Sequence, residues 1–217
     1  MNLPNLLTLL RIFFVPLLVA AVVMGSMDLR LGSLVIPNEL LALGIFLAAA
    51  ATDLLDGYLA RRWQQVTTVG TLLDPIADKL LISAALISLV QVHALPAWMA
   101  IIVVGREFAV TGLRSIAASA GYTIQASELG KTKMLAQVIA VSLFLLGMHW
   151  EGLKAWAMGW MWCVVVVAAL SAVGYFRKFW RKVDDRIKRR RRRELLRLER
   201  ARARAAVSAR GSGTQSG

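Results

Sequence analysis

The sequence predicts an all-α, polytopic membrane protein with six transmembrane helices, and three observations support this fold class. Hydrophobic residues make up 58% of the 217 residues and charged residues 18%, whereas soluble domains average about 45–50% apolar and about 25% charged. Six stretches each hold about 20 mostly apolar residues, which is the length that spans a bilayer. A single cysteine, Cys163, excludes a disulfide framework. The composition and the six apolar stretches therefore argue against a water-soluble globule.

The six predicted spans cover residues 6–25, 39–60, 71–92, 96–116, 134–150 and 153–176. No basic segment precedes the first span and five more follow it, so we expect a membrane helix there and not a cleaved signal peptide. Of the 26 Lys and Arg residues, 16 lie between Arg177 and Arg210, against 4 of the 13 acids. The chain thus divides into a transmembrane domain, 1–176, and a basic tail, 177–217, which we expect to be partly helical and then disordered.

The basic residues of the short links predict the orientation. Arg61 and Arg62 flank the link between spans two and three, and Arg114, Lys131 and Lys133 flank the link between spans four and five. These links and the basic tail fall on one side, which the positive-inside rule assigns to the cytoplasm. We therefore expect a multi-pass protein of the inner (cytoplasmic) membrane with both termini in the cytoplasm.

Four aspartates lie at the cytoplasmic ends of two consecutive spans. Asp53 and Asp56 end span two, and Asp74 and Asp78 begin span three. Spacings of three and four place each pair on one helix face. Because the link between these spans is short, the helices are antiparallel neighbours and all four carboxylates are expected to converge.

Convergent carboxylates repel one another strongly in a low dielectric unless cations neutralise them. Ligands that offer only oxygen favour Mg²⁺, with Mn²⁺ as a substitute, over zinc. Two such ions side by side form a phosphoryl-transfer site. The competing interpretation is that the acids only cap helix ends, which suits Asp74 before Pro75 but does not explain four acids on matched faces.

The acids belong to a longer pattern, Asp-x2-Asp-Gly-x2-Ala-Arg-x8-Gly-x3-Asp-x3-Asp, which runs from Asp53 to Asp78 and includes Gly57, Ala60, Arg61 and Gly70. This pattern resembles the signature of the CDP-alcohol phosphatidyltransferase family without departure. The first segment, from Asn2 to Arg11, also resembles the family. The run from Gly105 to Lys133 is similar to the bacterial branch whose acceptor is glycerol 3-phosphate. The resemblance covers residues 2–176 and does not extend to the basic tail.

The resemblance implies six transmembrane helices of the family type, a homodimer, and an enzyme that moves a phosphatidyl group from CDP-diacylglycerol to an alcohol with release of CMP. It implies two divalent ions held by Asp53, Asp56, Asp74 and Asp78, with Asp78 also acting as the catalytic base. For the CDP-lipid donor, it implies contacts from Asn5, Thr8, Gly57, Ala60, Arg61, Thr67 and Gly70.

A glycerol 3-phosphate acceptor needs cations near the metals, and the candidates are Arg106, Arg114, Lys131 and Lys133. Arg106 is the most informative because it lies deepest in its span. Its competing interpretation is an ion pair with Glu107 or a snorkelling contact. An inositol phosphate acceptor needs similar cations, and a second phosphatidylglycerol is a further alternative acceptor.

The basic tail is expected to lie against anionic membrane lipids. Nucleic-acid binding is not expected, because no aromatic platform accompanies the arginines. A cation-coupled transporter is an alternative function, but a transporter places its ionisable residues near mid-membrane on broken helices.

Overall fold

The computed structural model describes residues 3–24, 29–31, 34–63, 68–119 and 129–212. For residues 3–5, 7, 29–31, 34–35, 53–63, 68–75, 78, 129–132, 182–183, 185–187, 189–190 and 193–212 it describes the backbone only. Within these residues six α-helices carry the fold: α1 (Leu3–Val23), α2 (Asn38–Trp63), α3 (Thr68–Gln91), α4 (Ala97–Ser119), α5 (Leu129–His149) and α6 (Lys154–Ser212). Each overlaps one predicted span, so the helical class is confirmed.

The remaining elements are short. A 3₁₀ turn, η1 (Glu151–Leu153), joins α5 to α6. Two three-residue strands, β1 (Leu29–Leu31) and β2 (Leu34–Ile36), pair antiparallel between α1 and α2, with Leu29 opposite Ile36. This ribbon is not among the predicted elements, because its residues lie in a link too short and too mixed in character to carry a period-2 pattern.

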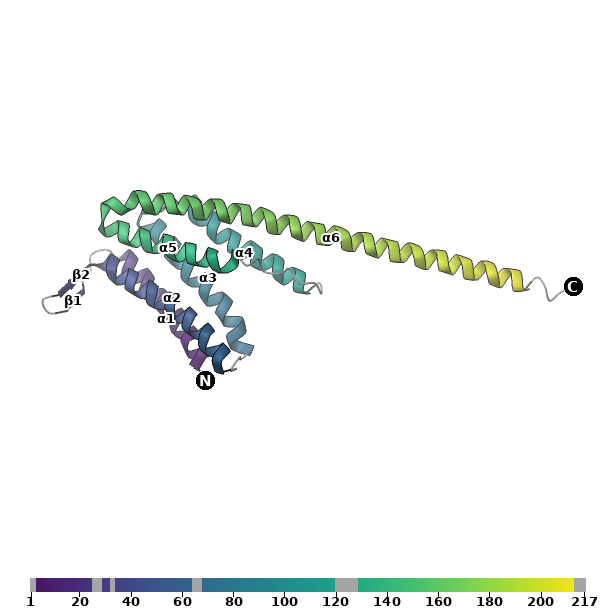
Figure 1. The fold of residues 1–217 in the computed structure, drawn as a ribbon, viewed down its shortest axis with the longest axis horizontal. Helices are drawn as coiled ribbons and strands as arrows, with labels where there is room; N and C mark the ends of the chain where they lie inside the picture. Colours follow the sequence, from purple (N-terminus) through teal and green to yellow (C-terminus); the bar gives the residue numbers. More distant parts are fainter. Residues whose placement is uncertain (1–2, 25–28, 32–33, 64–67, 120–128, 213–217) are drawn as a thin grey trace.

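The helices form two groups that meet at one end of the bundle (Figure 1). In one group, α1 packs against α2 and α3; in the other, α6 packs against α4 and α5. A continuous apolar core joins the groups, and its buried members include Leu18, Phe46, Leu86, Met99, Val141 and Met161, one from each helix. Burying these side chains is the main force that holds the helices together.

Local sequence explains where two helices begin and end. His93 adopts a left-handed conformation with φ of 58°, and the Ala94 and Leu95 amides donate to the carbonyl of Leu89. This is the αL ending that satisfies the last carbonyls of a helix. Pro96 precedes α4 and accepts a hydrogen bond from the Met99 amide, so the link between α3 and α4 is a tight turn.

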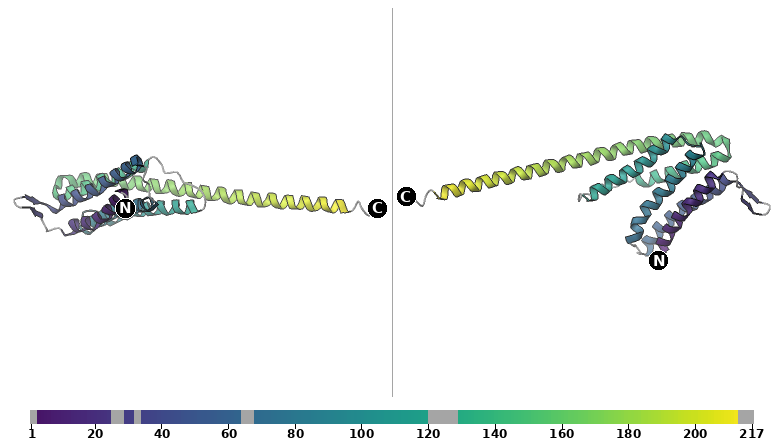
Figure 2. Two further views of the ribbon diagram at one scale, coloured as in Figure 1. Left: turned by 90° about the horizontal axis from the view of Figure 1, so that it is seen from below. Right: turned by 180° about the vertical axis from the view of Figure 1, so that it is seen from behind.

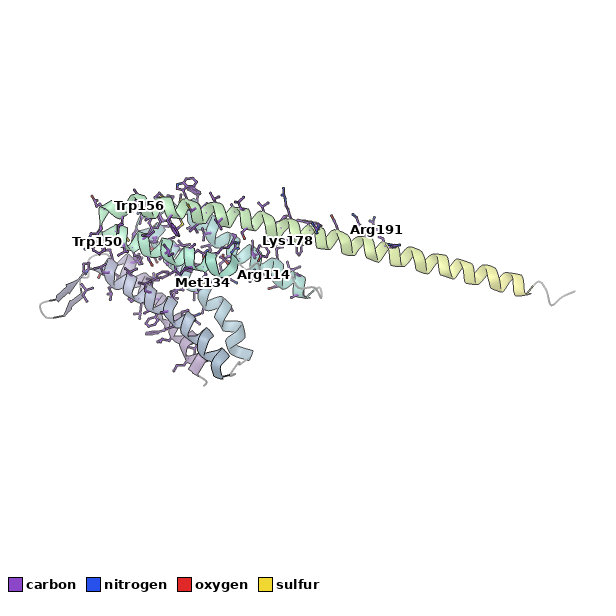
Figure 3. The ribbon with its side chains drawn as sticks, viewed as in Figure 1. Arg114, Met134, Trp150, Trp156, Lys178 and Arg191 are labelled. Atoms are coloured by element: carbon purple, nitrogen blue, oxygen red, sulfur yellow. The ribbon has the colours of Figure 1, made fainter. Side chains whose placement is uncertain are left out.

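The outer surface of the bundle is apolar on every helix. Exposed side chains include Phe13, Leu47, Ile87, Ile101, Leu135 and Leu170, and Trp156 projects from α6 in Figure 3. Such a surface matches a lipid environment and not water.

Within the described residues, one stretch, Glu151–Arg181, is long and apolar enough to cross a bilayer. Four shorter apolar stretches lie at Thr8–Val23, Asn38–Thr52, Lys79–Gln91 and Lys133–His149. All six helices have at least 21 residues. The number of six membrane crossings therefore stays a prediction.

Helix α6 continues past residue 176 and extends far beyond the other helices as one straight rod (Figures 1 and 2). Arg191 lies on this projecting part (Figure 3). The 36 residues from 177 to 212 would measure about 54 Å at the rise of an α-helix.

Candidate active site

The backbone brings the two aspartate pairs to matched heights on adjacent helices. Helices α2 and α3 are in contact and antiparallel, joined at the end where the chain passes from Trp63 to Thr68 (Figure 1). Asp53 lies ten residues before Trp63, and Asp78 lies ten residues after Thr68. Both positions are therefore about 15 Å from the joined ends.

The other two aspartates of the motif also lie at similar distances from the joined ends. Asp56 lies seven residues before Trp63, and Asp74 lies six residues after Thr68. Four carboxylates on two helices within about two turns of one another suit hard divalent cations, which take oxygen ligands. The donor types and their backbone placement thus fit a two-Mg²⁺ site.

The side chains of several predicted site residues lie outside the described residues. They are those of Asn5, Asp53, Asp56, Ala60, Arg61, Asp74, Asp78 and Lys131; of Gly57 and Gly70 the backbone is described, and Thr67 lies wholly outside the described residues. The predicted roles of these residues as metal ligands, base, donor contacts and acceptor contact stay predictions.

The first helix adds two buried polar residues at the aspartate end of the bundle. Thr8 is 1% exposed and Arg11 is fully buried. Both lie in the half of α1 that runs beside the end of α2 and the start of α3 (Figure 1). A buried guanidinium is costly unless polar or anionic groups satisfy it. Thr8 thus lies in the region where the donor contact was expected, and Arg11 brings a positive charge there.

Three helices bring two of the described acceptor cations, Arg106 and Lys133, together. Arg106 of α4 donates from Nη2 to Ser171 Oγ of α6 over 2.8 Å, and Lys133 of α5 donates to the same hydroxyl. Arg106 also forms an ion pair with Glu107, and its side chain is only 9% exposed. The competing interpretation of Arg106, a pair with Glu107, is thus present in the structure, but the guanidinium fork reaches Ser171 as well.

Glu107 is held from a second helix. Gln137 Nε2 of α5 lies 3.5 Å from Glu107 Oε1, at the limit of a hydrogen bond. Arg106 Nε is buried and has no partner among the described residues. Two cations and one carboxylate leave this cluster with a net positive charge, which suits a dianionic phosphate.

Arg114 is held by a different residue of α6. Its Nη2 donates to the Tyr175 hydroxyl over 2.6 Å, and its guanidinium carbon lies 5.1 Å from the centre of the Tyr175 ring. The ring face attracts the cation. Arg114 therefore lies two turns beyond Arg106 on α4 with a rigid partner of its own.

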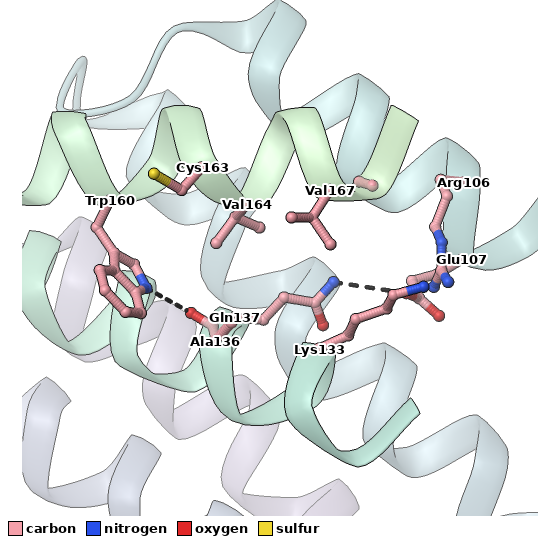
Figure 4. Close-up of a pocket in the computed structure, with 10 residues that line it drawn as sticks. Arg106, Glu107, Lys133, Ala136, Gln137, Trp160, Cys163, Val164 and Val167 are labelled. Atoms are coloured by element: carbon pink, nitrogen blue, oxygen red, sulfur yellow. Dashed lines mark hydrogen bonds and ion pairs between the residues drawn. The ribbon is translucent and has the colours of Figure 1, made fainter. Parts of the chain in front are cut away.

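A cavity of about 440 Å³ opens beside the Arg106 cluster, between α4, α5 and α6. Arg106, Glu107 and Lys133 lie at one end, and Trp160 and Cys163 lie toward the other (Figure 4). Trp160 Nε1 donates to the carbonyl of Ala136 over 3.0 Å. The walls between these ends are apolar, with Val164 and Val167 from α6. The cavity thus joins a cationic end to a hydrophobic groove.

Sequence reasoning missed Ser171, Tyr175 and Gln137. Each is a polar residue inside an apolar span, and Ser171 and Tyr175 are one helical turn apart on α6. An isolated polar residue in a membrane span is a usable signal for function. Which cation each one meets depends on how α6 packs, so the pairing was not predictable.

Comparison with known proteins identifies relatives along most of the chain. The sequence profile of the CDP-alcohol phosphatidyltransferase family matches residues 1–170. A Bacillus subtilis protein named CDP-diacylglycerol–glycerol-3-phosphate 3-phosphatidyltransferase is 45% identical over 185 residues, covering 82% of this chain and 95% of the relative. A Rickettsia felis protein of the same name is 36% identical, covering 70% and 79%. A Mycobacterium tuberculosis protein named probable phosphatidylglycerophosphate synthase is 36% identical, covering 84% and 83%.

Proposed function

Because the chain belongs to the CDP-alcohol phosphatidyltransferase family, we propose that it transfers a phosphatidyl group from CDP-diacylglycerol to sn-glycerol 3-phosphate. The products are phosphatidylglycerol phosphate and CMP, so the enzyme is a transferase of phospholipid biosynthesis. The observation that carries this proposal is the 45% identity, over most of both chains, to a relative named for this reaction.

In the reaction, a hydroxyl oxygen of the acceptor attacks the phosphorus that carries the diacylglycerol. The bond from that phosphorus to the CMP oxygen breaks, and the electron pair leaves with CMP. Asp78 takes the proton of the acceptor hydroxyl, the role of a general base. Gly57, Ala60, Arg61 and Gly70 contact the CDP part of the donor, together with Thr67, Thr8 and Asn5.

Asp53, Asp56, Asp74 and Asp78 would hold two Mg²⁺ ions, for which Mn²⁺ can substitute. When bound, these ions offset the charge of the pyrophosphate and of the departing CMP. The matched heights of the two aspartate pairs support this assignment, since all four lie within about 15 Å of the joined ends of α2 and α3.

The acceptor phosphate binds to Arg106, Arg114, Lys131 and Lys133. The meeting of Arg106 and Lys133 at Ser171 supports this role, because a phosphate oxygen that reaches the same place accepts from both cations. Inositol phosphate remains the alternative acceptor, since it presents the same anion.

The protein crosses the cytoplasmic membrane six times with both termini in the cytoplasm, and it forms a homodimer. The aspartate motif, the acceptor cations and the basic tail then share the cytoplasmic side, where the water-soluble substrate is found. The apolar exterior of all six helices supports this arrangement. The tail meets anionic lipids through the part of α6 nearest the bundle, because attraction to headgroups fades within a Debye length of about 8 Å.

Purified protein in detergent, supplied with CDP-diacylglycerol and Mg²⁺, tests the proposal. Glycerol 3-phosphate, inositol phosphate and phosphatidylglycerol are compared as acceptors by CMP release and by the lipid formed. We expect turnover with glycerol 3-phosphate at least tenfold above the others. Turnover with inositol phosphate alone would show that inositol phosphate, and not glycerol 3-phosphate, is the acceptor. No CMP release with any acceptor would contradict the transferase activity itself.

A further inference from the structure

A hydrogen bond joins the helix that carries Asp78 to the helix that carries the acceptor cations. Lys79 follows Asp78 on α3, and its Nζ donates to Thr111 Oγ1 of α4 over 2.5 Å. Thr111 Oγ1 in turn donates its proton to the carbonyl oxygen of Glu107 over 2.8 Å. The hydroxyl has one proton, which it donates to the Glu107 carbonyl, so its lone pairs are oriented to accept a hydrogen bond from Lys79.

The bond lies far from the turn that connects the two helices. Lys79 is 12 residues before the end of α3 at Gln91, and Thr111 is 14 residues after the start of α4 at Ala97. Both are about 18–21 Å from the link. The bond therefore fixes the separation and the relative height of α3 and α4 at the end of the bundle where the link does not constrain them.

Thr111 occupies a central place among the acceptor cations of α4. It lies five residues after Arg106 and three residues before Arg114, which corresponds to about 7.5 Å and 4.5 Å along the axis. Beyond Arg106 the polar contacts continue to Ser171 and Lys133. The Thr111 bond ends on the backbone carbonyl of Glu107, whose carboxylate pairs with Arg106. The contact from Lys79 and the contacts of the cations that meet at Ser171 therefore reach the same turn of α4.

We propose that the Lys79–Thr111 bond sets the distance between the base and the acceptor-phosphate site, and so selects acceptors by the number of carbons between their phosphate and their reacting hydroxyl. This inference rests on the proposed function. Glycerol 3-phosphate must bridge α4 and α3, with its phosphate on one helix and its hydroxyl at the other. Misplacement by about 1 Å is enough to cost about a hundredfold in rate, so a fixed spacing favours one acceptor length.

Lys79 and Thr111 are positioning residues in this account, since neither needs to touch the reacting atoms. A bond that only stabilises the fold predicts something different. Its loss would weaken activity equally for every acceptor, whereas loss of a spacing device changes the ratio between acceptors of different length.

The test measures kcat/KM with the monophosphates of ethylene glycol, 1,3-propanediol and 1,4-butanediol, which place the hydroxyl two, three and four carbons from the phosphate. CDP-diacylglycerol and Mg²⁺ are held at saturation. We expect the wild-type protein to prefer the three-carbon acceptor over the four-carbon one by tenfold or more. In Thr111→Val and in Lys79→Met we expect this preference ratio to fall at least fivefold. Because both substitutions remove the same bond, the ratio in the double variant should not fall below the smaller of the two single-variant ratios.

Two controls accompany these variants. Thr111→Ser keeps the hydroxyl and should keep the wild-type ratio. Ser119→Ala removes another α4 hydroxyl, which is exposed and donates to the backbone carbonyl of Ile116 over 2.9 Å. The preference ratio of this variant should also equal that of the wild type.

The outcomes separate the two proposals. Equal loss with all three acceptors in Thr111→Val, or an unchanged ratio, overturns the spacing role while the transferase stands. A wild-type protein that accepts none of these phosphates, and no glycerol 3-phosphate either, overturns the proposed function and the inference with it.

Discussion

Arg106 Nη2 lies 2.8 Å from Ser171 Oγ, although 65 residues separate them in the sequence. The same hydroxyl accepts from Lys133, so helices α4, α5 and α6 meet at one oxygen atom. Two cations directed at a neutral oxygen form a site with a net positive charge, because among the described residues Glu107 is the single carboxylate that pairs with Arg106. The following predictions concern this site, the aspartate motif and the tail.

Replacing Ser171 by Asp should block the acceptor site. A carboxylate between Arg106 and Lys133 supplies the anion that the acceptor phosphate would otherwise bring, so we expect the KM for glycerol 3-phosphate to rise at least tenfold, or about 1.4 kcal/mol. Ser171→Ala leaves both cations in place and should change this KM less than threefold. Steady-state kinetics with each substrate varied distinguishes the two. Equal kinetics for the Asp and Ala variants would argue that the phosphate binds elsewhere.

Replacing Arg106 by Ala should raise the KM for glycerol 3-phosphate by about thirtyfold or more. Losing a cation from a partly desolvated phosphate contact costs about 2–4 kcal/mol. Arg106→Lys keeps the charge but loses the forked guanidinium, so its KM for glycerol 3-phosphate should lie between those of the wild type and of Arg106→Ala. The KM for CDP-diacylglycerol should change much less.

Glu107→Gln is the matched control for Arg106, because it removes the ion pair and keeps the cation. If the ion pair only stabilises the fold, both variants lose activity alike with both substrates. If Arg106 binds the acceptor, Glu107→Gln keeps or lowers the KM for glycerol 3-phosphate while Arg106→Ala raises it.

Asp74→Asn should abolish CMP release even at high Mg²⁺, while the protein stays folded in the membrane. Asp74 is the first aspartate of the second pair, and we expect it to contribute to both ions, so a neutral side chain there is expected to disturb both. Activity is measured across a Mg²⁺ titration, and folding by thermal unfolding in detergent. Substantial turnover at saturating Mg²⁺ would refute the two-metal arrangement.

Asp78→Asn should slow the chemical step more than it weakens donor binding, because a base acts on the acceptor hydroxyl. We expect donor affinity to stay within about tenfold of wild type, since three other carboxylates hold the donor side. Equilibrium binding of CDP-diacylglycerol and single-turnover rates give the comparison. A variant that loses donor binding but keeps its rate at saturation would assign Asp78 to the donor side alone.

The tail should be cleaved by trypsin only from the cytoplasmic side. In sealed inverted membrane vesicles we expect the 177–212 helix to be digested, whereas vesicles of native orientation should protect it. In reconstituted vesicles, anionic lipid should slow cleavage near Arg177 and Arg181 relative to neutral lipid. High salt should abolish the difference, because it shortens the Debye length to about 3 Å at 1 M. Cleavage from the outer face would reverse the predicted orientation.

The sequence by itself determined the helical class, the six helices and the aspartate motif. Apolar runs of membrane length leave little choice but helix, since helical hydrogen bonds satisfy the backbone locally. The heights of Asp53 and Asp78 also followed from the sequence, because a short link forces α2 and α3 to run antiparallel. Sequence spacing and link length were enough to predict an arrangement wherever the two residues lie on consecutive helices.

Only the tertiary structure decided which residues hold the acceptor cations. Ser171 and Tyr175 meet Arg106 and Arg114 across 65 and 61 residues of chain, and Lys79 meets Thr111 across 32. These contacts depend on how far each helix is rotated and shifted against its neighbour, and interdigitating apolar side chains such as Met99 and Met161 set that rotation. Hydrophobic periodicity shows that a helix has a buried face, but the depth at which two such faces interlock is a property of the packed bundle.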